Sequence, residues 1–285
     1  MKLKQPFTVL YENELFLAVN KASGIAVSPD RWDESKERLD RLLDAYLSEK
    51  ASKAADNTAA PGLRVYTVHR LDKDTSGLVL FAKTPEAHRE LSLAFANNSV
   101  QKRYIAVIHG VPSWKETACD LPLVPGGDKK HRTIIDKYRG KKSLTFFRLL
   151  GSAGNYSLIE ALPKTGRTHQ IRAHLAALDH PLVCDPLYGR ASPKGILLSS
   201  LKRNWHGDPL DEKPLLDRLG LHAYELRLSA PLASLLRVTT PDNAPPDTPE
   251  TDADEDPVFR APFPRDFNAL IQQMGKSGRK SIPRL

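Results

Sequence analysis

Asp72 lies in the stretch of the chain whose residue types most clearly suggest chemistry. It stands between Arg70 and the sequence Thr75-Ser76-Gly77, just before an apolar run typical of a β-strand. A carboxylate held at a turn beside basic side chains can attack or stabilise the cationic C1′ that forms when a glycosidic bond breaks. Asp74 is the rival candidate, although an aspartate there more often hydrogen-bonds the backbone of its own turn. We therefore predict that Asp72 is a nucleophile in sugar chemistry.

Such an aspartate needs a cation beside it to stay ionised, and two arginines could provide one. Arg167 and Arg172 lie in the string Lys164–His174, beside a predicted helix start that Thr168 would cap. A guanidinium can bind a carboxylate through two parallel hydrogen bonds and so favours its ionised form. Without further information, both arginines could equally be surface residues on a solvated helix face.

Tyr104 opens an apolar strand-like run and follows two basic residues, Lys102 and Arg103. A lone tyrosine in a strand is usually a core or interface residue. A phenol can also stack on a nucleobase and remove a proton from it, because it combines a flat ring with a titratable oxygen.

Taken together, these strings resemble the motifs of the RluA-type family of RNA pseudouridine synthases. The resemblance rests on four segments, which are Val19–Gly24, His69–Gly77, Gln101–Gly110 and Lys164–His174. It implies that Asp72 is the nucleophile, that Arg172 is its salt-bridge partner, and that Tyr104 stacks on and deprotonates the target base. Asp185-Pro186-Leu187-Tyr188-Gly189 and Leu221-His222-Ala223 also look like later family segments.

The resemblance also implies a set of RNA-binding residues. An enzyme that modifies a base must take it out of the stack, and Arg70 is expected to assist this flipping. Arg167, Lys102, Arg103 and His69 complete the expected set, with His69 acting mainly as a structural hydrogen-bonding residue.

The chain departs from the family pattern in several respects. Ala22 stands where most relatives have proline, and neither the segment Arg190–Leu219 nor the acidic-then-basic tail matches a family pattern. The S4-type RNA-binding domain that precedes the catalytic region in many relatives is expected to be missing. The resemblance covers roughly residues 7 to 232.

Charge and composition favour a polyanionic partner. The 285 residues carry a formal net charge of +8, and residues 1–240 alone carry 36 Lys and Arg against 26 Asp and Glu, or +10. No apolar run approaches the ~20 residues that span a bilayer, and the two cysteines are too few for a disulfide framework. We expect a cytoplasmic, monomeric protein that binds RNA and no membrane.

No metal or cofactor is expected. The histidines lack the spacing of a zinc site, and the chain contains neither a phosphate-binding P-loop nor a dinucleotide-binding glycine motif. Isomerising uridine to pseudouridine requires no redox change and no external energy.

Predicted strands and helices are intermixed without a regular βαβ repeat, which favours a mixed α/β (α+β) fold. The family resemblance implies a bent, largely antiparallel sheet flanked by helices. The predicted strands cover residues 7–10, 15–19, 78–83, 104–108, 143–150 and 156–162. Helices are predicted from residue 39, from Thr84-Pro85-Glu86 and from Thr168.

Three regions are expected along the chain. Residues 1–240 form the catalytic domain, and residues 241–259 form an acidic, proline-rich linker. In the basic tail 260–285, the helical spacing of Phe267, Leu270, Ile271 and Met274 predicts a short helix. This tail is either a docking helix or an RNA-contacting arm.

The sequence thus predicts an enzyme that isomerises specific uridines in structured RNA, either ribosomal or transfer RNA. The main alternative is a non-catalytic RNA-binding protein on the same fold. A nucleoside hydrolase or glycosidase is the third candidate, but it would need a second carboxylate and gains nothing from excess Lys and Arg.

Overall fold

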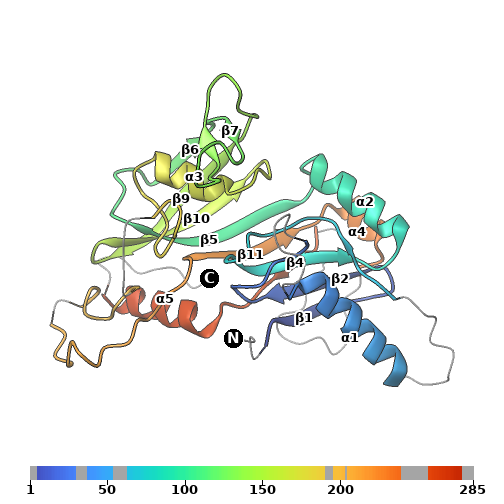
Figure 1. Ribbon diagram of the computed structural model, residues 1–285, viewed down its shortest axis with the longest axis horizontal. Coiled ribbons are helices and arrows are strands. Elements are labelled where there is room, and N and C mark those ends of the chain that lie inside the picture. The colour runs from blue at the N-terminus through green and yellow to red at the C-terminus, as the bar shows by residue number, and fades with distance from the viewer. Residues whose placement is uncertain are drawn as a thin grey trace. The chain divides into compact units, whose positions relative to one another are not determined.

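The computed structural model describes residues 5–29, 37–53, 63–189, 195–202, 204–238 and 256–277. The chain divides into two compact units, the first made of residues 1–101 and 223–262 and the second of residues 102–222 and 263–285. The chain passes from one unit to the other within the strands β5 (Gln101–His109) and β11 (Leu221–Arg227), which Figure 1 labels, and a third time after Pro262. The expected catalytic domain over 1–240 therefore comprises parts of both units.

The first unit is built on strands in the order β1-β2-β4-β11. Antiparallel pairing joins β1 to β2, β2 to β4, the short strand β3 to β4, and β12 to β11. The bounds of these strands are β1 (Phe7–Glu12), β2 (Phe16–Lys21), β3 (Tyr66–Thr67), β4 (Ser76–Ala82) and β12 (Val258–Arg260). All seven residues of β4 are buried, so this strand is the centre of the unit.

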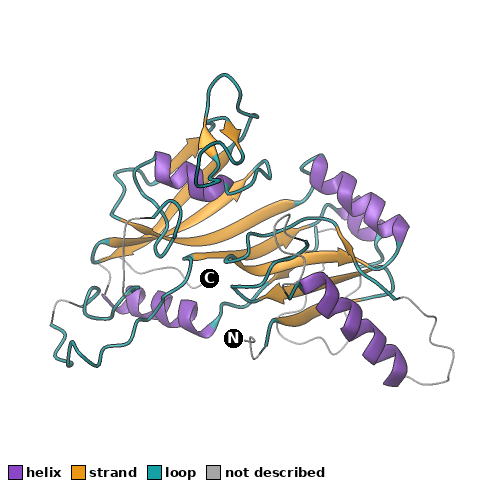
Figure 2. Ribbon diagram, viewed as in Figure 1, coloured by secondary structure: helices purple, strands orange, loops and turns teal. Residues whose placement is uncertain are grey.

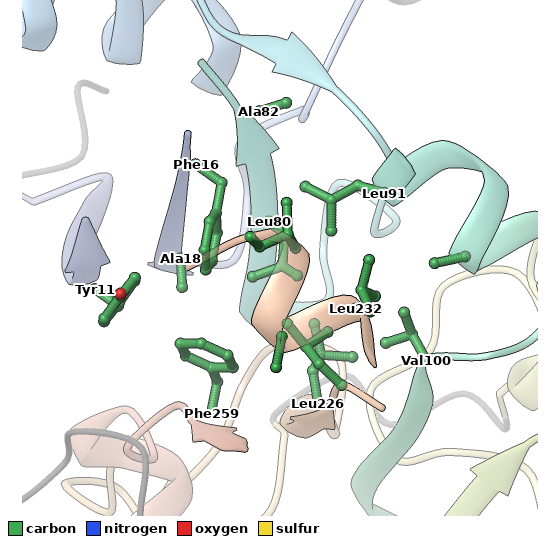
Figure 3. Packing of buried hydrophobic residues seen from close by; sticks show 14 of the residues in the cluster. Tyr11, Phe16, Ala18, Leu80, Ala82, Leu91, Val100, Leu226, Leu232 and Phe259 are labelled. Carbon is green, nitrogen blue, oxygen red and sulfur yellow. The ribbon is translucent and has the colours of Figure 1, made fainter. Parts of the chain in front are cut away.

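Among its described residues, the first unit has three helices, and Figure 2 distinguishes them from the strands. They are α1 (Leu39–Lys53), α2 (Pro85–Ala96) and α4 (Ala230–Leu235). The predicted start of α2 is confirmed, because the Thr84 hydroxyl accepts a hydrogen bond from the Ala87 N–H at 3.2 Å. Buried side chains of α2 and α4 meet those of the strands in one apolar cluster, which Figure 3 shows around Phe16, Leu80 and Phe259.

The second unit is built on the antiparallel strands β5, β10, β9 and β6, in that order. Their bounds, beyond that of β5, are β6 (Glu116–Cys119), β9 (Thr145–Ala153) and β10 (Tyr156–Pro163). A separate two-stranded ladder pairs β7 (Leu123–Val124) with β8 (Ile134–Ile135). Helix α3 (Gln170–Ala177) packs on β9 and β10, and helix α5 (Arg265–Ser277) packs on β9.

The prediction that Thr168 caps a helix is wrong. Helix α3 begins two residues later, after His169 in a left-handed conformation (φ 52°) that makes no side-chain cap hydrogen bond. The Thr168 carbonyl instead accepts a hydrogen bond from the Thr133 hydroxyl at 2.9 Å. A tertiary contact therefore determines where this helix starts.

The tail helix is confirmed, and it docks. Phe267, Leu270 and Met274 of α5 are buried. The Arg218 guanidinium holds the start of α5 by donating to both carboxylate oxygens of Asp266, at 2.6 and 2.8 Å. Most of the predicted linker, residues 241–255, lies outside the described residues, but its last residues belong to strand β12.

No helix among the described residues is long and apolar enough to cross a membrane. Both cysteines are free thiols, Cys119 buried and Cys184 half-buried.

Candidate active site

Asp72 is half-buried and opens a tight turn that leads into β4. The turn is closed by a hydrogen bond from the Thr75 N–H to the Asp72 carbonyl at 3.1 Å. Leu71 before Asp72 and Thr75 after it are both buried, so the backbone on each side of the carboxylate is anchored in the core. Asp72 is therefore presented from a fixed turn rather than from a free loop.

A fully buried lysine fastens this turn to the neighbouring segment. The Lys21 ammonium donates hydrogen bonds to the carbonyl oxygens of Ala22, Ile25 and Lys73, each at 2.9 Å. The Gly24 N–H also donates to the Lys73 carbonyl, at 2.9 Å. An ammonium has three donor hydrogens, and three backbone acceptors suit it in a place that water does not reach. The string Val19–Gly24 thus acts as a clamp under the Asp72 turn.

Asp74, the rival nucleophile, takes part in the same clamp through its backbone. Its carbonyl oxygen accepts a hydrogen bond from the Ser23 hydroxyl at 2.7 Å. Gly77 follows the turn with φ +116°, and a Cβ built there would lie 2.2 Å from the Ala223 carbonyl oxygen of β11. Only glycine allows β4 to start so close to β11.

His69 and Arg70 precede the turn and differ in exposure. His69 is half-buried; its Nε2 accepts a hydrogen bond from the Leu80 N–H at 2.9 Å, and its ring stacks on Phe95 with centroids 4.1 Å apart. Because Nε2 is the acceptor, a neutral imidazole carries its proton on Nδ1. Arg70 is exposed. His69 therefore has a structural role on β4, whereas the Arg70 side chain is open to a ligand.

In the second unit, Tyr104 is half-buried on β5, opposite Ala161 of β10. It packs on the apolar cluster beneath α3.

Two basic residues, Lys102 and Arg103, precede Tyr104 on β5. Burial and the charge of Lys164 lower the pKa of Lys102. Arg103 donates to Glu160, at 2.5 Å between Nε and Oε1, so this predicted RNA-binding residue is engaged in an ion pair.

Arg172 is a buried residue of α3 with a bidentate partner. Its Nε and Nη2 atoms donate to Oδ2 and Oδ1 of Asp185, both at 2.8 Å. The guanidinium also lies over the ring of Tyr188, 5.2 Å from its centroid. The arginine predicted to act beside the nucleophile is thus held in one orientation by a carboxylate and an aromatic face.

Asp185, the buried partner of Arg172, is the candidate site residue that sequence reasoning missed. Its Oδ1 also accepts the N–H groups of Leu187 at 2.9 Å and Tyr188 at 3.1 Å. Burial alone raises the pKa of a carboxyl group, but the hydrogen bonds and charge of Arg172 outweigh burial and hold the pKa of Asp185 below its usual value. The string Asp185–Gly189 was a visible signal, although nothing in it indicated the partner of Asp185.

Two buried polar side chains of α3 fix the helix against β9. Nδ1 of His174 lies 3.0 Å from the Thr145 hydroxyl, and its Nε2 lies 3.0 Å from the Leu121 carbonyl. The Gln170 amide donates to the Leu144 carbonyl at 3.0 Å, and its oxygen accepts the Arg167 N–H at 3.0 Å. The exposed Arg167 guanidinium donates to the Lys142 carbonyl at 3.2 Å. These contacts fix the position of Arg172, two residues from each anchor.

Among the described residues, no group of three or more His, Cys, Asp or Glu side chains could hold a metal ion. The first unit gathers Asp72 with its lysine clamp, and the second gathers Arg172, Asp185 and Tyr188. Each predicted catalytic side chain lies on an element anchored by buried contacts.

Comparisons with known proteins show the family to which the chain belongs. Residues 15–177, more than half of the chain, match the family of RNA pseudouridylate synthases. A ribosomal large subunit pseudouridine synthase D of Zymomonas mobilis is 38% identical over 191 residues, which cover 65% of this chain and 57% of that protein. A protein of the same name from Nitrosomonas europaea is 30% identical over 282 residues, covering 98% of this chain and 68% of that protein.

Two solved structures share the fold. Human RNA Pseudouridylate Synthase Domain Containing 4 matches with a TM-score of 0.63 at 19% identity, over 93% of this chain and 92% of that chain. Human RNA Pseudouridylate Synthase Domain Containing 1 matches with a TM-score of 0.56 at 24% identity, over the full length of both chains. The predicted mixed α/β fold, a large and mostly antiparallel sheet flanked by helices, is thereby confirmed, and the chain belongs to the RNA pseudouridylate synthase family.

Proposed function

We propose that this protein converts specific uridines of structured RNA, ribosomal or transfer RNA, to pseudouridine in the cytoplasm and without a cofactor. Family membership supports the reaction type. The net charge of +8 suits a polyanionic substrate, and the free cysteines suit a reducing compartment.

The proposed reaction is an isomerisation in which atoms balance without a second substrate. The C1′–N1 bond of the uridine breaks, the uracil turns, and a C1′–C5 bond forms to the same ribose. The proton on C5 is removed and N1 gains one, so that no electron donor, oxidant or energy source is consumed.

Asp72 is the proposed nucleophile that attacks or stabilises C1′. The observation that carries this assignment is the clamped turn, in which the buried Lys21 joins the Lys73 carbonyl, directly after Asp72, to the carbonyls of Ala22 and Ile25. A positioned carboxylate lowers the barrier because its orientation is fixed before the substrate arrives.

Arg172 and Tyr104 complete the proposed catalytic set. Arg172 keeps Asp72 ionised during turnover, and its orientation is set by Asp185. Tyr104 stacks on the flipped uracil and removes the C5 proton.

The proposed RNA contacts begin with Arg70, which is exposed and helps to extrude the target base. Arg167 is exposed as well and binds phosphate, together with Lys102 and Arg103. His69 supports this surface by its hydrogen bond to β4.

A pseudouridine map of cellular RNA tests the proposal. RNA from cells with the gene, cells without it, and cells complemented with Asp72→Asn or Asp74→Asn is treated with carbodiimide and read by reverse transcription. We expect sites that vanish on deletion and return with the wild type and Asp74→Asn, but not with Asp72→Asn. If Asp72→Asn restored these pseudouridine sites, the assignment of Asp72 as the nucleophile would be refuted. Purified protein that binds total RNA in a salt-dependent way but forms no pseudouridine would favour the non-catalytic alternative.

A further inference from the structure

A short segment of the second unit carries much of the positive charge of the protein. Residues 128–142, here called the basic segment, contain seven Lys and Arg against two Asp, a net +5 where the whole chain has +8. The segment includes β8 and the turn after it, next to the strand labelled β7 in Figure 1. Neither the catalytic set nor the predicted RNA-binding residues include any of its side chains.

Both acids of the basic segment are bound within it. Asp128 accepts the Arg132 side chain at 2.6 Å, and Asp136 accepts the Arg139 side chain at 2.7 Å. Hydrogen bonds from the Arg139 N–H, the Arg139 side chain and the Tyr138 N–H lower the pKa of Asp136 to about 2. The acids therefore order the backbone, and Lys129, Lys130, Lys137, Lys141 and Lys142 remain as the excess charge.

Tyr138 stands at the tip of the turn with 98% of its surface exposed. Asp136 fixes this turn by accepting the N–H groups of Tyr138 at 2.9 Å and Arg139 at 3.0 Å through Oδ1, while its carbonyl accepts the Gly140 N–H at 2.9 Å. A Cβ on Gly140 would lie 2.3 Å from the Asp136 carbonyl oxygen, so the turn depends on glycine there. The aromatic ring is thus held in solvent between Lys137 and Arg139 by an ordered backbone.

The basic segment is hydrogen-bonded to the residues that lie against Arg172. The Thr133 N–H donates to the Tyr188 hydroxyl at 2.7 Å, and that hydroxyl donates to the Thr133 carbonyl at 3.0 Å. Arg132 also donates to the Leu187 carbonyl, at 3.3 Å. Tyr188 is the ring beneath the Arg172 guanidinium. The backbone that would hold a ligand on the basic segment is therefore connected, through Tyr188 and Leu187, to the surroundings of the proposed catalytic Arg172.

One exposed aromatic side chain needs no functional explanation by itself. An exposed ring flanked by two cations on a pre-ordered turn has the composition of a stacking platform for single-stranded nucleic acid, in which bases stack on the ring and phosphates contact the cations. A protein partner with an acidic surface would not require the ring, and a paired duplex could not stack a base on it.

We infer that Tyr138 stacks on an unpaired RNA base other than the target uridine, while Lys137 and Arg139 contact the phosphates beside that base. This inference rests on the proposed function in that the partner is RNA. It adds a substrate requirement, an unpaired nucleotide near the modified one.

Binding of two RNA probes to the full-length protein tests the inference. The probes are a fluorescein-labelled 12-nucleotide oligouridine and a blunt 12-base-pair RNA duplex, measured at low salt. A base–aromatic stack is worth about 1–3 kcal/mol, or about 5- to 150-fold in affinity, and we expect the lower end for an exposed ring. Tyr138→Ala should weaken oligouridine binding about fivefold to tenfold and leave duplex binding unchanged, whereas Tyr138→Phe should retain full affinity.

Leu210→Ala is the matched control, because Leu210 is another large apolar side chain of the second unit and is 92% exposed. It should change neither affinity. Lys137→Ala should lower the salt dependence of oligouridine binding by about 0.7 in the log–log slope, the value for one phosphate on a single strand. Tyr138→Trp reports stacking directly, since oligouridine should quench the added indole emission.

Three outcomes would overturn the inference. They are equal oligouridine affinity of Tyr138→Ala and wild type, an equal loss for both probes, and an indole emission that oligouridine leaves unchanged. A pseudouridine assay of the wild type and Asp72→Asn on total RNA runs in parallel. If the wild type is active and Tyr138→Ala binds normally, the platform is wrong and the proposed function stands. If the wild type is inactive, the proposed function itself fails, whatever Tyr138 does in the binding assay.

Discussion

Arg172 and Asp185 form a buried, bidentate ion pair with two N–O distances of 2.8 Å. The two residues are thirteen positions apart, one on α3 and the other in the turn that ends at Gly189. Because Asp185 binds the Nε edge and Tyr188 lies against the guanidinium plane, the rotation of the arginine is determined before any substrate binds. We therefore predict that Asp185 is a positioning residue that acts through Arg172.

Replacing Asp185 by asparagine should lower both stability and turnover. Removing one partner of a buried ion pair leaves an uncompensated charge and typically costs about 3–5 kcal/mol. We expect unfolding in urea to show a loss toward that range, and kcat to fall about 100-fold with little change in KM, because orientation is lost rather than affinity.

A double-mutant cycle supplies the control for Asp185. Arg172→Met and Asp185→Asn should each destabilise the protein, and the double variant should be less destabilised than the sum by about 2 kcal/mol or more. Additive losses would mean that the pair does not couple. An unchanged kcat in folded Asp185→Asn would remove its positioning role.

Lys21→Met should loosen the turn that carries Asp72. The substitution removes a donor from the carbonyl groups of Ala22, Ile25 and Lys73, of which the last keeps its hydrogen bond from the Gly24 N–H, at a cost of about 2–5 kcal/mol in total. Movement of the turn should lower kcat by about 10- to 100-fold. The kinetics are measured under conditions in which nearly all of the variant protein is folded. Lys73→Met is the control, since the Lys73 side chain is exposed and only its carbonyl takes part. Wild-type kcat in Lys21→Met would show that the clamp does not position Asp72.

Local patterns predicted those parts of the fold that local chemistry determines. The start of α2 was predicted correctly because a threonine cap and a proline at the first helical position act within four residues. The same reasoning failed at Thr168, where the backbone is held by Thr133, 35 residues away. Strand β12 was missed for a similar reason: three residues beside an acidic, proline-rich stretch become a strand only because β11 offers them a pairing edge.

In the candidate site, too, local sequence patterns indicated some residues, whereas tertiary contacts revealed others. Asp72, Arg172 and Tyr104 were chosen as catalytic from strings that resemble a family, and those roles remain predictions. The partner of Arg172 could not be chosen in this way, because several acids were equally available in sequence and only folding brings Asp185 to it. The clamp by Lys21 was equally hidden, since its acceptors are backbone carbonyls, which every residue possesses.

Gly77→Ala should destabilise the first unit strongly. The added Cβ would lie 2.2 Å from the Ala223 carbonyl oxygen, and φ +116° is strained for any side chain. Overpacking and backbone strain each cost about 1–3 kcal/mol, so we expect a loss of roughly 3 kcal/mol or more in urea unfolding. Gly24→Ala separates the two causes, because Gly24 has φ +91° with nothing within 4 Å of its Cβ position. It should show the strain alone; an equal loss in both variants would mean that the approach of β4 to β11 tolerates a methyl group.

Stability should fall as the pH drops below about 6.5, and His174 should be a principal cause. Burial lowers the pKa of His174 in the folded protein, although its hydrogen bond to the Leu121 carbonyl and the charge of Asp120 partly oppose this. The unfolded chain then binds a proton at a higher pH than the folded one. The stability is complete above the unfolded pKa near 6.5 and is lost progressively as the pH falls toward the folded value.

Urea unfolding at pH 7.5, 6.5 and 5.5 measures this effect of His174. The wild type should lose stability across the series, and His174→Gln should be less stable at pH 7.5 but lose less on acidification. His206→Gln is the control, since His206 is exposed and belongs to the same unit. The buried carboxyl groups with lowered pKa values in the same unit, such as Asp185 and Asp266, titrate below this range, so they do not obscure the comparison. An identical pH dependence in wild type and His174→Gln would assign the acid sensitivity to another group.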